Sequence, residues 1–308
     1  MNKVYNAIMG LVVGDALGVP VEFKKRDTYE ITNMIGYGTY NQPPGTWSDD
    51  SSMTLATLES IARIGRVDAM DIMKNFENWL YNGEFTPYGV TFDVGGTTQA
   101  AISRFNRGCP LKDCGGKSIN DNGNGALMRI LPISLIPYSD VKRYNISSVT
   151  RLTHAHDISI TASFIYTTVV EAILNGQPKE KAVEIGVEDF RSQIMYIATL
   201  SDYKALFNIN TLSRDDIKSS GYVVDTLEAA LWCLYHTDNY RNCVLTAVNL
   251  GEDTDTVAAV AGGLAGLYYG CGGEKGIPLE WIEKIPRKEW ITQLCNDFNK
   301  NVCSKGSN

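Results

Sequence analysis

Apolar residues recur along much of the chain with the spacing of an α-helix. Beyond position 50, Leu55, Leu58 and Ala62 follow an i, i+3, i+7 pattern. The same kind of spacing continues in further segments, with apolar positions at Ile160 and Phe164 before Thr167, at Leu227, Leu231, Leu234 and Tyr235, and at Val257, Val260, Ala261, Leu264, Leu267 and Tyr268. Gly270 and Gly272 follow the last segment as helix stop signals. The pattern predicts a helix in each segment.

Strand signals are weak in comparison. The segment Ile130-Leu131-Pro132-Ile133 is short and contains a proline, which removes a backbone donor. No internal repeat and no linker rich in Pro, Ser or charge divides the chain. The least regular stretch is 83–125, and long irregular loops tend to be functional or mobile. We therefore expect an all-α fold in a single compact multi-helix domain spanning residues 1–308.

The composition is that of an ordinary globular protein. Of 308 residues, 44% are hydrophobic and 20% charged, and the formal net charge is −7. This balance argues against a broad nucleic-acid surface, and an anionic substrate would have to be attracted locally, by a metal or by backbone N–H groups. The apolar run at 7–13 is short and broken by glycines, so we expect no membrane span and no signal peptide. Seven cysteines without a Cys-x-x-Cys pair favour reduced thiols and a cytoplasmic location.

Two acidic clusters lie far apart in the sequence, and each precedes an apolar helical pattern. They are Ser48-Asp49-Asp50-Ser51 and Asp253-Thr254-Asp255-Thr256, about 200 positions apart. Carboxylates and hydroxyls without a soft ligand nearby suit a hard cation such as Mg²⁺ or Mn²⁺. If the fold brings the clusters together, four aspartates could hold two cations, which would indicate hydrolysis or phosphate chemistry. We expect the first and last thirds of the chain to pack together and form this site.

Helix capping is the simpler explanation of each cluster taken alone. Asp and Ser side chains accept hydrogen bonds from the free N–H groups of a first helical turn and complement the helix dipole. One cap satisfies a helix, however, so alternating aspartates and hydroxyls exceed what capping needs. Aspartates crowded together without a cation would also raise the pKa of one another by repulsion. The pairing of the two clusters therefore favours metal binding.

The N-terminal helical segment carries spaced glycines and two acids. Gly10 and Gly14 have the spacing of close helix packing through small faces. Asp15 lies in an apolar segment, where an unpaired carboxylate is costly, so a specific role is expected for it. Glu22 is either a surface residue or a carboxylate that points into a pocket, where it could act on water.

A glycine-rich loop, Asn122-Gly123-Asn124-Gly125, precedes Ala126-Leu127-Met128-Arg129. Such a loop exposes N–H groups that can hold a phosphate, although a plain turn is the more common explanation. It is not a Walker loop, because Lys and Ser or Thr do not follow the last glycine.

Two histidines and one further acid complete the candidates. His154 and His156 would face apart on a helix, which disfavours a shared metal, and His154 is either a pocket residue or a surface or capping residue. Asp93 is flanked by glycines, and its simplest role is the N-cap of the helix that follows.

Together these motifs resemble the ADP-ribosylglycohydrolase family, which includes the dinitrogen-reductase-activating type of enzyme. The matching pieces occur in the family's order over roughly residues 1–270. They are Gly14-Asp15-Ala16-Leu17-Gly18 with Glu22, Gly45-Thr46-Trp47-Ser48-Asp49-Asp50, Asp93-Val94-Gly95-x-Thr97-Thr98, Asn122–Arg129, Leu152-Thr153-His154, and Gly251-x-Asp253-x-Asp255-Thr256.

The resemblance implies an all-α fold around two Mg²⁺ or Mn²⁺ ions and a role for each matched residue. The implied metal ligands are Ser48, Asp49, Asp50, Asp253, Asp255 and Thr256, with Asp255 as the bridge. Glu22 and Asp93 match acids that are catalytic or lie near the metals in family members. The implied substrate-binding residues are Asn122, Gly123, Asn124, Gly125 and Met128, at the diphosphate, and His154 near it.

The implied activity is hydrolysis of the glycosidic bond between ADP-ribose and a target. The cations would fix the ribose hydroxyls and lower the pKa of a water, while Asp93 or Glu22 would guide that water or protonate the departing group. We expect a monomer that acts on ADP-ribosyl-arginine in proteins. Serine-linked, nucleic-acid and small-molecule ADP-ribosyl compounds are alternative substrates. A catalytically silent ADP-ribose-binding or structural relative, and a phosphohydrolase using the same acids, are alternative functions.

Overall fold

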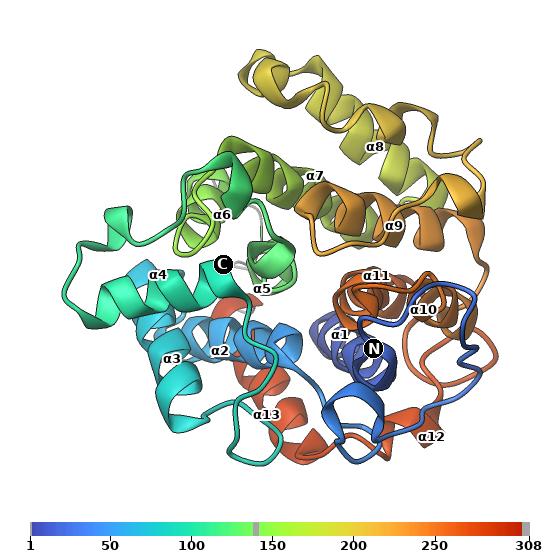
Figure 1. The fold of residues 1–308 in the computed structure, drawn as a ribbon, viewed down its shortest axis with the longest axis horizontal. Helices are drawn as coiled ribbons and strands as arrows, with labels where there is room; N and C mark the ends of the chain where they lie inside the picture. Colours follow the sequence, from blue (N-terminus) through green and yellow to red (C-terminus); the bar gives the residue numbers. More distant parts are fainter. Residues whose placement is uncertain (1, 138–141, 304–308) are drawn as a thin grey trace.

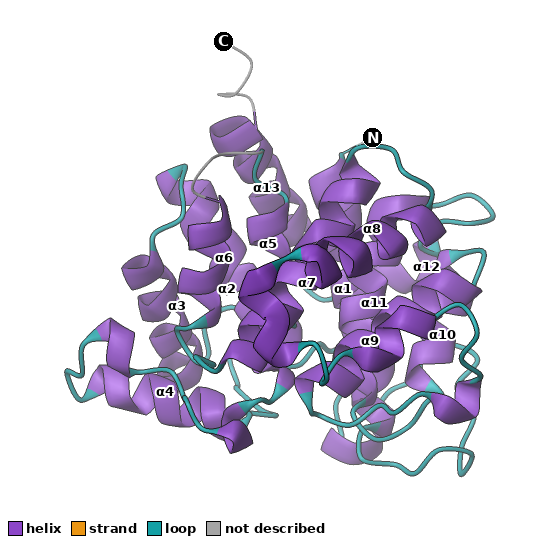
Figure 2. Cartoon of the chain, turned by 90° about the horizontal axis from the view of Figure 1, so that it is seen from above, coloured by secondary structure: helices purple, strands orange, loops and turns teal. Residues whose placement is uncertain are grey.

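The chain folds into packed helices (Figures 1 and 2). The computed structural model describes residues 2–137 and 142–303. Within these ranges, pairing of extended backbone is limited to isolated bridges, and no β-sheet forms. The expected all-α fold is confirmed. The helices are α1 Lys3–Gly18, α2 Asp49–Ile64, α3 Ala69–Asn82, α4 Gly96–Asn106, α5 Leu131–Ser134, α6 Lys142–Thr150, α7 Asp157–Leu174, α8 Lys179–Ser192, α9 Val223–His236, α10 Tyr240–Val248, α11 Thr254–Tyr269, α12 Leu279–Ile282 and α13 Lys288–Phe298.

Helices α1 and α11 lie side by side and make the most extensive helix contact of the fold (Figure 1). A Cβ at Gly10 would lie 2.3 Å from the carbonyl oxygen of Gly262. A Cβ at Gly14 would lie 2.1 Å from the carbonyl oxygen of Ala258. Contact this close between two backbones leaves room for no side chain at either position. The prediction that Gly10 and Gly14 serve close helix packing is confirmed.

The remaining helices pack around this pair. Helices α9 and α10 pack against α11, while α2 packs between α3 and α13. Helix α7 contacts α6, α8 and α9 (Figure 1). The indole rings of Trp47, Trp79 and Trp281 are fully buried among these helices. The first and last thirds of the chain therefore meet, chiefly through α1 with α11 and through α2 with α13, as the sequence predicted.

The segments with clear helical spacing all form helices. They correspond to α2, α7, α9 and α11, and α11 ends at the predicted stop, Gly270. The stretch 83–125 is less irregular than expected, because it contains α4 and short 3₁₀ turns. The segment around Pro132 forms the one-turn helix α5, in which proline occupies an early position that needs no N–H donor.

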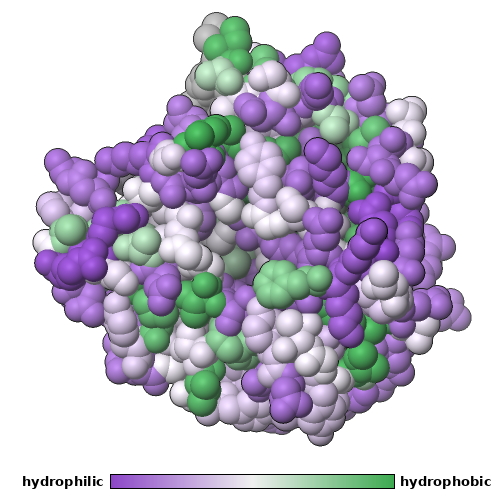
Figure 3. All heavy atoms as spheres, in the orientation of Figure 1, coloured by the Kyte–Doolittle hydropathy of each residue, from purple (hydrophilic) through white to green (hydrophobic). Residues whose placement is uncertain are grey.

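Two helical segments are long and apolar enough to cross a membrane on length and composition alone. They are Lys3–Val21 and Asp157–Leu174. This finding corrects the sequence interpretation, which considered only positions 7–13 and judged the run too short. In the fold, 94% and 78% of the residues in their apolar windows are buried, so packing against other helices accounts for their composition. On the face drawn in Figure 3, hydrophobic side chains lie in small separate groups among hydrophilic ones.

A methyl group at the α1–α11 contact should destabilise the fold. We expect Gly14→Ala to lower the free energy of unfolding by about 1–3 kcal/mol, because the new Cβ overlaps the backbone at Ala258. Gly96→Ala is the matched control, because a Cβ there meets nothing within 4 Å. Urea unfolding followed by circular dichroism measures both changes. Equal unfolding midpoints for Gly14→Ala and the parent protein would contradict this account of the contact.

Candidate active site

The N-terminal ends of α2 and α11 meet at the C-terminal end of α1. Gly18 permits this approach, since a Cβ there would lie 2.3 Å from the Cα atom of Asp255. The hydroxyl of Thr254 donates to the carbonyl oxygen of Gly18 at 2.9 Å. The first turn of α11 is therefore held directly against the end of α1.

Asp15, which is fully buried on α1, holds the first turn of α2 in the same place. Its carboxylate accepts hydrogen bonds from the backbone N–H groups of Ser48 (2.9 Å) and Ser51 (3.0 Å). It also accepts from the Ser51 hydroxyl at 2.5 Å. These contacts satisfy both oxygens of Asp15, so its role is to cap α2 and orient it. Asp15 is therefore buried but paired, which avoids the cost of an unpaired buried carboxylate.

The two acidic clusters come together in the fold. The hydroxyl of Thr256 donates to Asp50 Oδ2 at 3.3 Å, which joins residues 206 positions apart in the chain. The hydroxyl of Ser48 donates to the same oxygen at 3.1 Å. Asp49 precedes Asp50 in the first turn of α2. It lines a cavity whose wall also includes Glu22 and Asp253.

Two triads of carboxylates share Asp255. One triad contains Asp15, Asp50 and Asp255, and the other contains Glu22, Asp253 and Asp255; within each, one oxygen of every member lies within 4.8 Å of the others. Among the described residues, the buried oxygens Asp50 Oδ1, Asp253 Oδ1, Asp255 Oδ2 and Glu22 Oε2 have no hydrogen-bond partner. Buried carboxylate oxygens without donors are costly, and a cation supplies the missing contact. This donor set fits hard divalent cations.

Burial and mutual repulsion oppose the ionised form of these acids. Burial raises the pKa of Asp49, Asp50 and Asp255 well above the ordinary value, and the charges of neighbouring acids raise it further. The pKa of Glu22 is raised to about 9, by burial and then by the charge of Asp93. Without cations Glu22 therefore retains a proton near neutral pH, and the ionised form of the aspartates is disfavoured; a bound cation would favour the ionised form and displace protons.

Asp93 and Glu22 line the same cavity, and Tyr40 contacts the first of them. The Tyr40 hydroxyl donates to Asp93 Oδ1 at 2.6 Å, and its ring centroid lies 5.1 Å from that of Phe92. The N-cap of α4 is Gly95, without a side-chain cap, so Asp93 is not the helix cap that the sequence suggested as its simplest role. Tyr40 was not predicted, because nothing in its local spacing distinguishes it from other tyrosines.

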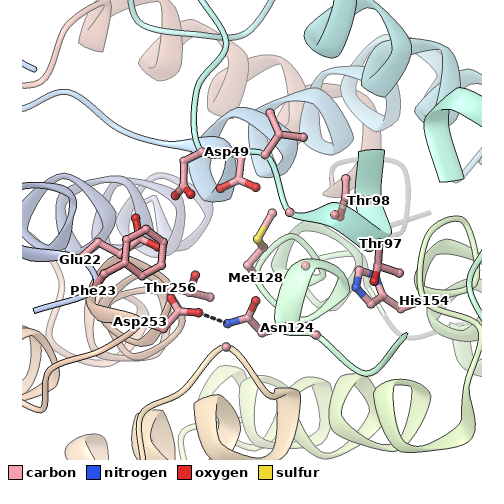
Figure 4. Close-up of a pocket in the computed structure, with 17 residues that line it drawn as sticks. Glu22, Phe23, Asp49, Thr97, Thr98, Asn124, Met128, His154, Asp253 and Thr256 are labelled. Atoms are coloured by element: carbon pink, nitrogen blue, oxygen red, sulfur yellow. Dashed lines mark hydrogen bonds between the residues drawn. The ribbon is translucent and has the colours of Figure 1, made fainter. Parts of the chain in front are cut away.

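The glycine-rich loop forms part of the wall of this cavity, which has a volume of about 300 Å³. Gly123, Asn124, Gly125 and Met128 all line it. The side-chain amide of Asn124 donates to Asp253 Oδ2 at 2.9 Å (Figure 4). This contact links the loop directly to the acids at the start of α11.

Asn122 holds this loop from behind and does not line the cavity. Its side-chain oxygen accepts from the Ser159 hydroxyl at 2.9 Å, and its amide nitrogen donates to the carbonyl oxygen of Ile119 at 3.0 Å. Its backbone carbonyl accepts from the N–H group of Val223 at 3.0 Å. Among the predicted substrate-binding residues, Asn122 therefore departs from expectation: its amide is occupied in positioning the loop.

His154 lies against the loop, on the far side of the cavity from Glu22 (Figure 4). A Cβ at Gly125 would lie 2.9 Å from its Cε1 atom, and a Cβ at Gly123 would lie 3.5 Å from its Nε2 atom. Burial, together with the charge of Arg129, lowers the pKa of His154 to about 3. The imidazole is therefore neutral near pH 7.

The first turn of α4 completes the wall beside His154. Gly95, Gly96, Thr97 and Thr98 line the cavity, and no side chain caps this helix. The free N–H groups of a helix N-terminus and the positive end of its dipole suit an anion. The sequence interpretation assigned no binding role here. The sequence signal that could have indicated a binding role is the Gly-Gly-Thr-Thr run at the start of a helical segment.

Comparisons with known proteins agree with this geometry. The whole chain, residues 1–308, matches the family described as ADP-ribosylglycohydrolase. The ADP-ribosylarginine hydrolase Tri1 of Serratia proteamaculans is 34% identical over 97% of this chain and 79% of its own length. The ADP-ribosyl-(dinitrogen reductase) glycohydrolase of Rhodospirillum rubrum is 32% identical over 93% of this chain and 91% of its own.

A solved structure described as an ADP-ribosylglycohydrolase-related protein complex has the same fold. It superposes with a TM-score of 0.81 at 29% identity and covers 97% of this chain and 98% of its own. The resemblance inferred from the motifs is thus confirmed. The chain belongs to the ADP-ribosylglycohydrolase family of enzymes, which hydrolyse glycosidic bonds that join ADP-ribose to other groups.

Proposed function

We propose that this chain releases ADP-ribose from arginine side chains of modified proteins, with two Mg²⁺ (or Mn²⁺) ions held by its buried acids. The observation that carries the proposal is a cavity with two chemically different ends (Figure 4). The acids Glu22, Asp49 and Asp253 line one end. The first turn of α4, the Gly123–Gly125 loop and His154 line the other. ADP-ribose matches this division, because its terminal ribose carries a pair of hydroxyls and is attached to a diphosphate.

Oxygen atoms from both acidic clusters would hold the cations, with Asp255 contributing to both positions because it belongs to both triads. When bound, the cations would act as Lewis acids that fix and polarise the oxygens they contact. Glu22, whose Oε2 has no partner among the described residues, is a further candidate contact in the second triad. The proposed ligands are Ser48, Asp49, Asp50, Asp253, Asp255 and Thr256.

The acids of the chain would also carry out the proton transfers. Cleavage at the anomeric carbon of ribose develops positive charge on the sugar ring, which nearby carboxylates stabilise. The Tyr40 hydroxyl occupies Asp93 Oδ1, which leaves Asp93 Oδ2 to take a proton from the attacking water. Glu22 could donate a proton to the departing group in the arrangement in which no cation contacts it, because burial raises its pKa to about 9 in the cation-free protein.

An exposed aromatic ring at the cavity suits a guanidinium group. Phe23 is 69% exposed and lines the cavity beside Glu22. Its ring packs edge-on against Tyr40, with the centroids 6.5 Å apart. Guanidinium groups stack on aromatic rings, so Phe23 could recognise an arginine side chain. The name of the Serratia proteamaculans relative, an ADP-ribosylarginine hydrolase, supports the same substrate.

A panel of ADP-ribosylated arginine, serine and nucleic-acid substrates tests the linkage. We expect the arginine substrate to give the highest kcat/KM. We expect Phe23→Ala to lower kcat/KM about 3- to 30-fold on arginine, by loss of cation–π stacking, and to change turnover of the serine substrate much less. Release of ADP-ribose, followed by chromatography, measures each value.

Phe23→Tyr keeps an aromatic face and is the matched control, so it should behave as the parent protein does. An equal loss on all linkages in Phe23→Ala would show that the ring does not recognise arginine. A preference for serine or nucleic-acid substrates by the parent protein would overturn the proposed linkage.

Asp255→Ala should lose both cation binding and turnover. The substitution removes the carboxylate common to both triads, so we expect kcat to fall by more than about 100-fold, since even loss of an outer contact to a metal site costs 10- to 100-fold. Mn²⁺ binding measured by electron paramagnetic resonance should weaken in parallel. Asp113→Ala, at an exposed ion pair with Lys117, is the control and should change neither quantity. Full activity in Asp255→Ala would end the proposed metal role.

Cation binding should weaken as the pH falls. The pKa values of Asp49, Asp50, Asp255 and Glu22 are raised, so these groups take up protons as the pH decreases, and a cation must displace them. For each proton displaced, we expect the apparent affinity for Mg²⁺ to fall about tenfold per pH unit between pH 8 and pH 6. Calorimetry in buffers of different ionisation enthalpy counts the protons released. An affinity independent of pH would show that the acids are already ionised in the free protein.

A further inference from the structure

Arg129 is a fully buried cation without a carboxylate partner among the described residues. Burial lowers its pKa to about 9, so it is still charged at pH 7. Its guanidinium carbon lies 4.7 Å from the centre of the Phe76 ring, and one nitrogen donates to the carbonyl oxygen of Val149 at 3.5 Å. A buried, unpaired charge is costly, so its presence calls for a function.

The strongest contact of Arg129 is with Thr153. Arg129 Nη2 donates to Thr153 Oγ1 at 2.5 Å, and the same hydroxyl lies 2.8 Å from His154 Nδ1. All three side chains are buried, with exposed fractions of 2% or less. They form a chain of polar groups that begins behind the cavity and ends at a residue in its wall.

The direction of these hydrogen bonds follows from what each group can donate. A guanidinium only donates, so Thr153 Oγ1 must accept from Arg129. The single hydrogen of the Thr153 hydroxyl is then free to go to His154 Nδ1. The reverse arrangement, with Nδ1 protonated, would leave that hydroxyl hydrogen buried without an acceptor, which is costly. His154 Nδ1 is therefore an acceptor, and the hydrogen of the neutral ring sits on Nε2.

The positive charge of Arg129 also disfavours a second proton on the ring. It acts in the same direction as burial, and together they lower the pKa of His154 to about 3. Nε2 is the ring nitrogen beside Gly123, and Gly123 and His154 both line the cavity. The free N–H group therefore lies at the wall that the glycine-rich loop and the start of α4 form (Figure 4).

We propose that Arg129 and Thr153 are positioning residues that fix His154 as a neutral donor through Nε2–H to a phosphate oxygen of the substrate. That the acceptor is a phosphate oxygen rests on the proposed function, whereas the tautomer and charge of the His154 ring do not. Neither Arg129 nor Thr153 lines the cavity, so both act through His154.

Nuclear magnetic resonance of ¹⁵N-histidine-labelled protein tests the state of the ring directly. The chain has 3 histidines, and a His154→Gln variant identifies the signals of His154. The nitrogen shifts and two-bond couplings should show Nε2 protonated and Nδ1 unprotonated. The opposite tautomer, or a positively charged ring at pH 7, would overturn the inference whatever the activity of the enzyme.

Substitutions at Thr153 then test how the tautomer is set. Thr153→Val keeps the shape of the side chain and removes the hydroxyl, so both tautomers should become populated. The affinity for ADP-ribose, measured by calorimetry, should fall about three- to tenfold, while adenosine, which lacks phosphate, should lose none. Thr153→Ser restores the hydroxyl and should restore both the tautomer and the affinity.

Arg129→Met is a second variant that tests the inference, and it leaves Thr153 in place. Without the guanidinium, the positive charge that opposes a second proton on the ring is gone, so the pKa of His154, followed by the same nitrogen shifts, should rise. A folded Thr153→Val protein with an unchanged tautomer, or a folded Arg129→Met protein with an unchanged His154 pKa, would overturn the inference. A correct tautomer in a parent protein that fails to cleave arginine-linked ADP-ribose would instead count against the proposed function and leave this inference standing.

Discussion

The burial of several carboxylates around one point is the constraint on which the rest of the structure depends. Asp50, Asp253, Asp255 and Glu22 each keep a buried oxygen without a donor among the described residues. Hydrophobic packing around such a cluster cannot relieve the repulsion within it, because low polarity strengthens the interaction between like charges. The charge must be removed by protons or balanced by cations. The fold is therefore organised to hold together groups that repel one another.

Two features of the helices hold the acids together: the N-terminal ends of α2 and α11, and the close contact between α1 and α11. Asp49, Asp50 and Asp255 lie in the first turns of α2 and α11, where the positive ends of the helix dipoles stabilise their negative charge. Glycines between α1 and α11 fix the separation of these helices by backbone contact. Asp15 then ties α2 to α1 with hydrogen bonds from Ser48 and Ser51. The position of the acids thus rests on backbone contact between α1 and α11 and on the buried, fully hydrogen-bonded side chain of Asp15 between α1 and α2.

Much of this could be predicted from the sequence, and what was missed has identifiable causes. The helices α2, α7, α9 and α11 were predicted because their apolar spacing is long and regular. Helix α3 has a comparable signal in Ile72, Phe76 and Trp79, which the interpretation did not use.

The site, too, could be predicted from the sequence only in part. The acidic clusters were recognisable because a run of aspartates and hydroxyls is unusual. Tyr40 and Asn122 differ, since their roles depend on hydrogen bonds to Asp93 and Ser159 that only the folded chain creates. No spacing rule identifies a contact of that kind.

The two ends of the cavity impose opposite electrostatic demands on a single ligand. A diphosphate carries negative charge and would lie in the same cavity as Asp49 and Asp253. The described residues that line the cavity include no Lys or Arg, the imidazole of His154 is neutral, and Arg129 lies buried behind the wall. The wall therefore does not neutralise the phosphates, so the compensating charge must come from cations at the acidic end. It follows that cations and ADP-ribose should each raise the affinity of the site for the other, as reciprocal linkage requires.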